Sequence, residues 1–197
     1  MRYLQGTIHY FLKYQKGKDV HLRGFIDWGG NEKDGRSTIG GCFSLGLSMV
    51  SWMCKKQETV ALSSAEVEYI ASCEVSKEAV WLRKMLSDLL VGPLDPTIIH
   101  CDNTSSIRLY EDLVFHGKTK HINNKYHYIR KLVPDCVLKL EYIPTDDQTA
   151  DILTKSLPNK NLVYFRNKLG LVDISSIVHR ERYNIILVFV LEERIKD

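Results

Sequence analysis

This sequence of 197 residues has few of three things: paired cysteines, long hydrophobic runs and net charge. Its five cysteines are scattered without a Cys-x-x-Cys pair, which argues against a zinc ribbon or a disulfide framework and fits a reducing compartment. The longest apolar run, residues 185–191, is far shorter than the roughly 20 residues of a membrane span. The N-terminus is polar and aromatic from Met1 onward, so no signal peptide is expected. A formal net charge of +3 is too small to imply a polyanionic partner.

What remains is the composition of a soluble globular protein, with a length that suits one domain and a tail. Alternating and helical apolar patterns predict a mixed sheet covered by helices, which is the α/β class. The polar, Gly-rich stretch 27–41 predicts a loop, and Gly46 joins two strands of an antiparallel meander. The predicted strands are residues 20–27, 42–45, 48–52, 57–62, 97–101 and 137–143.

The helical pattern is strongest after Ser63, which has capping-box spacing to Glu66. Residues 1–19 also have rough helical spacing, whereas residues 172–197 have neither a clear cap nor turn signals after Ser176. Further helices are predicted over residues 104–112 and 119–133 and in two stretches that run to about residue 169. The long helix carries one apolar stripe, made of Val67, Ala71, Val75, Leu82, Met85, Leu86 and Leu89.

Four acidic residues lie in four different kinds of segment: Asp27, Glu68, Asp102 and Asp151. Carboxylates brought together by a fold repel one another unless a cation lies among them. The first three each have an ordinary alternative role: Asp27 in a turn, Glu68 paired with a lysine, and Asp102 as a helix N-cap. Asp151 has no capping role, because Thr145 or Asp146 can cap its helix. The ordered set, more than any member, therefore indicates a Mg²⁺ site.

The helical wheel separates two glutamates of the long helix. Glu68 lies about 60° from the centre of the apolar stripe, and Glu66 lies about 140° away. Glu66 is therefore expected in solvent. Glu68 faces the sheet, where an unpaired carboxylate is costly.

Five stretches, in the same order, resemble the ribonuclease H domain of Copia-type (Pseudoviridae) LTR-retrotransposon Pol polyproteins. They are GFIDWGGNEKDGRSTIGG (24–41), VSWMCKKQETVALSSAEVEYIA (50–71), IHCDNTSSI (99–107), FHGKTKHINNKYHYIRKLV (115–133) and EYIPTDDQTADILTKSLP (141–158). The resemblance covers about residues 1–173 and implies a ribonuclease H-like α/β fold, with a five-stranded mixed sheet and helices on both faces. It also implies three parts: residues 1–19 as the connecting segment from a missing reverse transcriptase, residues 20–171 as the ribonuclease H-like domain, and residues 172–197 as an atypical C-terminal tail.

The resemblance further implies Mg²⁺-dependent endonucleolytic hydrolysis of the RNA strand of RNA–DNA hybrids during reverse transcription. Asp27, Glu68, Asp102 and Asp151 match the family's catalytic and metal-binding Asp-Glu-Asp-Asp set. Two Mg²⁺ ions, or Mn²⁺ as a substitute, would make a nucleophile of water and stabilise the departing 3′ oxygen. The implied partners are the hybrid and the reverse transcriptase of the parent polyprotein, in cytoplasmic virus-like particles. No membrane and no small-molecule cofactor are implied.

Two departures from the family pattern bear on activity. The chain is shorter than the pattern around Asp27, which leaves open whether this residue keeps register with the other carboxylates. The loop 144–148 also lacks the His that cellular ribonucleases H carry there, although Copia-type members resemble this chain at that point. The alternatives to an active enzyme are a catalytically impaired nucleic-acid-binding remnant and an interaction module that keeps only the fold. An integrase-like core is disfavoured, because Glu68 lies on the first helix.

A basic stretch, residues 116–133, supports nucleic-acid binding, because it has no acidic residue and includes aromatic side chains. The alternative is a solvated helix face. Lys55 and Lys56 precede the long helix and could touch phosphate, while Asn103 and Ser105 could reach the sugars of a hybrid. The candidate nucleic-acid-binding residues are therefore Lys55, Lys56, Asn103, Ser105, Lys118, Lys120, His121, Lys125 and Arg130.

Overall fold

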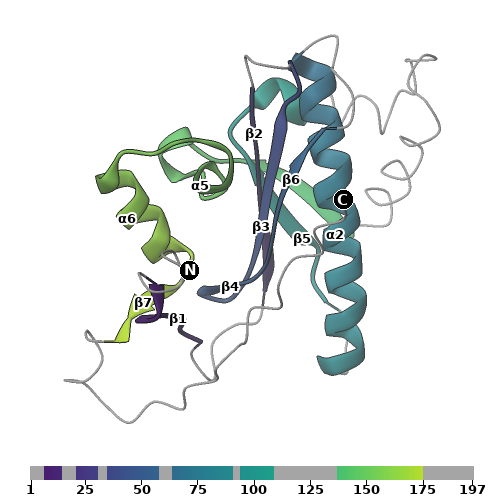
Figure 1. Ribbon diagram of the computed structural model, residues 1–197. Coiled ribbons are helices and arrows are strands. Elements are labelled where there is room, and N and C mark those ends of the chain that lie inside the picture. Colours follow the sequence, from purple (N-terminus) through teal and green to yellow (C-terminus); the bar gives the residue numbers. More distant parts are fainter. Residues whose placement is uncertain are drawn as a thin grey trace.

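A five-stranded mixed sheet forms the centre of the computed structural model, which describes residues 7–14, 21–30, 35–57, 64–90, 94–108 and 137–174. The strand order is β4-β3-β2-β5-β6 (Figure 1). β2, β3 and β4 are antiparallel neighbours, whereas β5 runs parallel to β2 and β6 runs parallel to β5. The α/β class and the five-stranded mixed sheet of a ribonuclease H-like fold are therefore confirmed. The strands are β2 (Leu22–Gly29), β3 (Thr38–Leu45), β4 (Ser48–Lys56), β5 (Thr97–Cys101) and β6 (Leu138–Tyr142).

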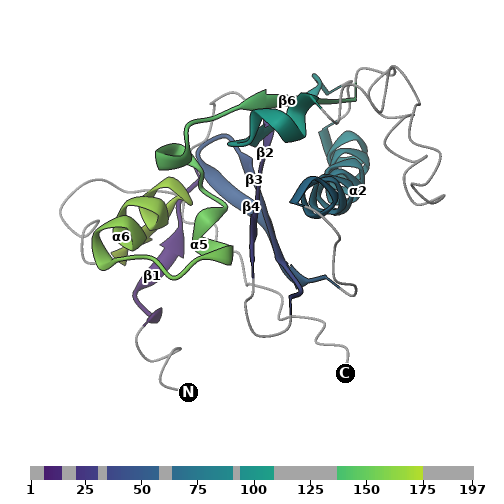
Figure 2. The ribbon, with the colours of Figure 1, turned by 90° about the horizontal axis from the view of Figure 1, so that it is seen from above.

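Helices cover the two faces of this sheet unequally. The long helix α2 (Ser64–Leu90) lies on one face, against β2 and β3. The short helix α5 (Asp151–Thr154) lies on the opposite face together with α6 (Asn159–Lys168), as Figure 2 shows. The 3-10 helix η2 (Thr145–Asp147) comes just before α5. One helical stretch over residues 104–108 follows β5.

The apolar stripe of α2 is only partly confirmed. Four members, Ala71, Val75, Leu82 and Leu86, are buried in the main core, and Val67 is also buried. Two others were predicted wrongly: Met85 is 38% exposed and Leu89 is 69% exposed. The last turns of α2 run past the ends of the strands (Figure 1), which accounts for the exposure of Leu89 close to the end of the helix at Leu90.

The two strands that flank the first loop are longer than the sequence pattern indicated. β2 continues to Gly29 and β3 begins at Thr38, so the loop predicted over residues 27–41 is shorter than expected. Backbone pairing between neighbouring strands extends through glycine and polar residues, which a propensity argument places in loops. The separate strand predicted over residues 57–62 is not seen at Gln57, and its other residues lie outside the described part.

The N-terminal segment was predicted as a helix, and this was wrong for Tyr10–Leu12. These residues form β1, which pairs antiparallel with β7 (Leu171–Asp173) in a separate two-stranded sheet. The apolar pattern here is too short to sustain a helix by itself, and a partner strand distant in sequence decides the conformation. The boundary predicted after residue 19 stays a prediction, as does the tail beyond residue 174, which lies outside the described residues.

The described helices and cysteines bear on two features, membrane spans and disulfides. None of the described helices is both long and apolar enough to cross a membrane. The four cysteines in the described segments, Cys42, Cys54, Cys73 and Cys101, form no disulfide with one another.

The pairing of β1 with β7 can be tested by amide hydrogen exchange. The Lys13 N–H donates to the Gly170 carbonyl at 3.1 Å, and the Ile174 N–H donates to the His9 carbonyl at 2.8 Å. We expect both amides to exchange at least about tenfold more slowly than in an unstructured chain, because each must open before it exchanges. NMR-detected exchange in D₂O measures this. Unprotected amides at both positions would show that the N-terminal segment is a linker outside the fold.

Candidate active site

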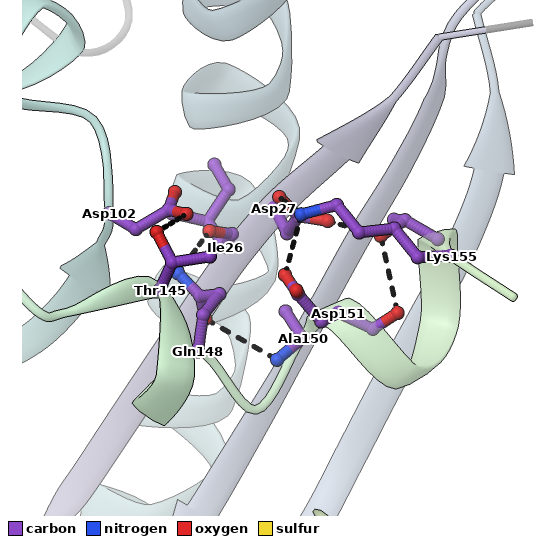
Figure 3. Close-up of polar contacts among 9 residues, drawn as sticks. Ile26, Asp27, Asp102, Thr145, Gln148, Ala150, Asp151 and Lys155 are labelled. Atoms are coloured by element: carbon purple, nitrogen blue, oxygen red, sulfur yellow. Dashed lines mark hydrogen bonds and ion pairs between the residues drawn. The ribbon is translucent and has the colours of Figure 1, made fainter. Parts of the chain in front are cut away.

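Three of the four predicted carboxylates meet at one edge of the sheet (Figure 3). Asp27 lies near the C-terminal end of β2, Asp102 follows β5 directly, and Asp151 is the first residue of α5. One oxygen from each of the three lies within 4.8 Å of the others. Parallel pairing of β2 and β5 sets Ile26 beside Cys101. The residue after each of these two is an aspartate, so Asp27 and Asp102 lie at the same edge of the sheet. The shortened segment around Asp27 therefore does not separate it from Asp102 and Asp151.

The position of Asp151 depends on how closely α5 approaches the sheet. Gly40 of β3 lies opposite Asp27 in the antiparallel register. A Cβ on Gly40 would come within 2.5 Å of the Thr154 Cγ2 atom and 3.1 Å of the Leu153 Cβ atom. The hydrogen of glycine leaves room where any larger side chain would collide with α5. This glycine therefore allows the helix to carry Asp151 up to Asp27.

A buried glutamine fixes the loop before α5. Gln148 is fully buried, and its Nε2 donates to the Ile26 carbonyl at 2.9 Å (Figure 3). Its Oε1 accepts from the Ala150 N–H at 3.3 Å. The side chain thus joins the residue before Asp27 to the residue before Asp151. Sequence reasoning treated Gln148 only as part of a loop, and no local pattern signals this long-range contact.

Asp102 is held by a hydroxyl and is not the helix cap. The Oδ1 atom of Asn103 accepts from the backbone N–H groups of Ser105 and Ser106 at 2.9 and 3.3 Å. Asn103 therefore caps the helical residues 104–108, and the capping alternative for Asp102 is wrong. The Oδ2 atom of Asp102 instead accepts from the Thr145 Oγ1 at 3.0 Å (Figure 3).

A lysine that sequence reasoning missed lies among the carboxylates. The Lys155 Nζ lies 2.9 Å from the Asp151 Oδ1 and 3.2 Å from the Asp27 Oδ1 (Figure 3). The Thr154 hydroxyl donates to the other oxygen of Asp27. The spacing of Asp151 and Lys155, four residues apart in a helical segment, is a pattern that could have found this pair.

Electrostatics at Asp27 oppose its charged form. Burial raises the pKa of Asp27 above its ordinary value, and the nearby charge of Asp151 raises it further. The hydrogen bond from Thr154 and the charge of Lys155 act in the other direction without cancelling the effect of burial. Burial by itself would lower the pKa of Lys155, but the two carboxylates outweigh it and that pKa is raised. Ionised Asp27 is thus less favourable in the fold than in water.

The other predicted site residues either lie outside the described part of the structure or lie away from the three carboxylates. The backbone of Glu68 belongs to α2, but its side chain is outside the described part of the structure, as are residues 118, 120, 121, 125 and 130 of the basic stretch. Lys55 and Lys56 are exposed on β4, where the Lys55 Nζ lies 3.4 Å from a Glu74 carboxylate oxygen. Ser105 is exposed, whereas the Asn103 side-chain oxygen is engaged in capping.

Comparisons with known proteins point to one family. The chain is 36% identical over 176 residues to the retrovirus-related Pol polyprotein from transposon RE1 of Arabidopsis thaliana, which is 88% of this chain and 12% of that protein. It is 36% identical over 173 residues to the corresponding polyprotein from transposon TNT 1-94 of Nicotiana tabacum, which is 87% of this chain and 13% of that protein. The chain therefore spans about an eighth of the length of these relatives.

Protein-family models and solved structures give weaker matches than the polyproteins do. No protein-family model matches the chain. Among solved structures, LC11-RNase H1, isolated from compost, aligns with 73% of this chain and 99% of its own length, at 19% identity and a TM-score of 0.49.

The close approach at Gly40 can be tested by adding one methyl group. We expect Gly40→Ala to lower the free energy of unfolding by about 1–3 kcal/mol, because Thr154 and Leu153 must move away from the sheet. Gly30→Ala is the matched control, since a Cβ there meets no atom within 4 Å. Urea unfolding of both variants measures the difference. Equal stabilities would mean that α5 does not pack closely on β3.

The raised pKa of Asp27 leads to a second prediction, which concerns how the stability of the protein depends on pH. Because the pKa of Asp27 is raised above 3.8, the folded protein holds a proton there more tightly than the unfolded chain does. This stabilisation is complete below the unfolded pKa and is lost as pH rises through the folded pKa. We expect Asp27→Asn, which cannot ionise, to raise the melting temperature in EDTA at pH 7.5 by a few degrees, with the gain vanishing toward pH 3.8. A lower melting temperature for the variant at pH 7.5 would contradict the burial of an unfavourable charge.

Proposed function

Because this chain belongs to the Copia-type retrovirus-related Pol polyproteins, we propose that it hydrolyses the RNA strand of RNA–DNA hybrids with the help of divalent metal ions. The observation that carries the proposal is the convergence of Asp27, Asp102 and Asp151 at one edge of the sheet. These residues come from β2, from the end of β5 and from α5, so only the folded chain brings them together. The chain spans only 12–13% of its relatives, and the reaction is therefore inferred for this domain alone.

The donor set fits a hard divalent cation. Carboxylate oxygens are the ligands that Mg²⁺ prefers in proteins, with Mn²⁺ able to take the same ligands. A positive group already lies among these oxygens, since the Lys155 ammonium contacts two of them. Asp27, Asp102 and Asp151 would hold the ions, with Glu68 of α2 as the fourth ligand. When bound, a pair of such ions supplies an activated water and stabilises the leaving oxygen in phosphodiester hydrolysis.

The chain's own residues hold this donor set in place before any substrate arrives. The Thr154 hydroxyl orients Asp27, and the Thr145 hydroxyl orients Asp102. Gln148 joins the segments that carry Asp27 and Asp151. Ligands that are fixed in this way lose little conformational freedom on binding, which favours precise placement of the reacting groups.

The family also suggests the substrate and the partner that we propose for this chain. A hybrid would be recognised by phosphate contacts from the basic stretch 116–133 and from Lys55 and Lys56, together with 2′-hydroxyl groups sensed on one strand only. Asn103 is a weaker candidate than expected, because its side-chain oxygen caps a helix. The reverse transcriptase of a parent polyprotein would make the hybrid, in cytoplasmic virus-like particles.

A second candidate function is nucleic-acid binding without cleavage, as in a catalytically impaired remnant. One observation favours it: Lys155 already neutralises charge between Asp27 and Asp151. A lysine that never left this position would keep divalent ions away from both carboxylates.

The proposal is tested by cleavage of an end-labelled RNA–DNA hybrid in Mg²⁺. We expect internal cuts in the RNA strand that EDTA abolishes. Asp102→Asn should slow cleavage at least about 100-fold, because losing a ligand costs more than losing a residue that supports one. Asp146→Asn, an exposed aspartate in the same region, is the matched control and should cleave normally.

The outcomes separate the two candidates. Cleavage that Asp102→Asn removes and Asp146→Asn retains supports the nuclease. Salt-sensitive hybrid binding by the unsubstituted protein, with no cleavage in Mg²⁺ or Mn²⁺, supports the non-catalytic candidate. Equal cleavage by the unsubstituted protein and Asp102→Asn would assign the activity to a contaminant and refute the nuclease.

A further inference from the structure

The ammonium group of Lys155 stands where two buried carboxylates need a positive charge. Its Nζ lies 2.9 Å from the Asp151 Oδ1 and 3.2 Å from the Asp27 Oδ1, and Figure 3 shows all three side chains pointing toward one another. The side chains of Asp27 and Asp151 are only 5% and 8% exposed. Two ionised carboxylates so buried and so close repel one another unless a cation lies between them. Among the described residues, Lys155 is the cation that contacts both.

We propose that Lys155 is a built-in counter-ion, which holds Asp27 and Asp151 together while no divalent ion is bound and leaves when one binds. The inference rests on the proposed function to the extent that a divalent ion must bind at these carboxylates. Loading of the site is then an exchange of one cation for another, and Lys155 competes with the metal.

The geometry explains why the lysine must leave. Lys155 contacts the Oδ1 atom of Asp27, and the Thr154 hydroxyl donates to the Oδ2 atom, so both oxygens of this carboxylate are engaged. A divalent ion that took the Oδ1 atom would bring its charge next to the ammonium, and like charges in a half-buried site repel strongly.

The geometry also indicates which partner moves. Asp27 is in a strand with neighbours on both sides, and Asp151 begins a helix packed on the sheet. Lys155 follows the last residue of α5 and its side chain is 38% exposed, on a flexible four-carbon stem. The ammonium can therefore turn into solvent while the two aspartates stay in place.

Competition between Lys155 and a divalent ion has measurable effects that differ from those of a lysine with a purely structural role. Replacing Lys155 with a neutral residue leaves the carboxylates unpaired, so the metal-free protein becomes less stable. The same change removes a competing charge, so the divalent ion binds more tightly. A lysine whose only role was to shape the site would, when removed, weaken both stability and metal binding.

The test is a calorimetric titration of the full chain with Mn²⁺ alone, combined with thermal unfolding. We expect Lys155→Gln to lower the Kd for Mn²⁺ by about 3- to 30-fold. The melting temperature of this variant should fall in EDTA and recover at saturating Mn²⁺. Lys155→Arg, which keeps the charge, should behave like the unsubstituted protein. Lys139→Gln removes a surface ion pair with Glu141 and is the control for loss of a lysine elsewhere. An unchanged or higher Kd in Lys155→Gln would overturn the proposal.

A second measurement needs no variant and covers the case in which Lys155→Gln does not fold. Acetylation of lysines in the unsubstituted protein, read by mass spectrometry, should modify Lys155 slowly in EDTA and at least about threefold faster in saturating Mn²⁺. Equal or slower modification with Mn²⁺ would overturn the proposal. The exposed Lys139 should react equally in both conditions.

These readouts separate this inference from the nuclease. Tighter Mn²⁺ binding by Lys155→Gln without any hybrid cleavage would support the counter-ion and count against the nuclease. Hybrid cleavage with an unchanged Kd in Lys155→Gln would support the nuclease and overturn the counter-ion. Absence of Mn²⁺ binding to every form would overturn both.

Discussion

Two buried aspartates of like charge set the main constraint on this structure. Asp27 and Asp151 are far apart in the sequence and lie at the same edge of the sheet as Asp102. Burial removes water from the charges and proximity makes them repel, so the arrangement is unfavourable by itself. The raised pKa of Asp27 is the direct expression of this cost. Proteins retain such local costs where function requires them, and this cluster is suited to holding cations.

Uncharged residues hold much of the carboxylate cluster in place. Gly40 lets α5 come down onto β3, and Gln148 fastens the loop before α5 to the backbone of β2. The Thr145 hydroxyl donates to Asp102, and the Thr154 hydroxyl donates to Asp27. None of these contacts involves residues close together in sequence, so the site depends on the packing of the whole α5 side of the sheet. Lys155 is the exception, because it is four residues from Asp151.

Several elements could be predicted because their patterns are local. The meander of β2, β3 and β4 follows from alternating residues and the turn at Gly46, which has a positive φ of 66°. The run Thr97–Cys101 is a buried strand, as its β-branched composition indicates. The failures have non-local causes. Tyr10–Leu12 pairs with a strand more than 150 residues away, and Leu89 is exposed because α2 outruns the sheet.

Local patterns and their succession along the chain were enough to predict the α/β class, the order of the acidic residues and the family resemblance. The folded structure was needed to show that Asp27 keeps its place beside Asp102, since this depends on the parallel register of β2 and β5. It also showed that Asn103, and not Asp102, caps the following helix. The position of Lys155 between two carboxylates was likewise decided in three dimensions, because charge balance in a buried cluster is a property of distances and not of order along the chain.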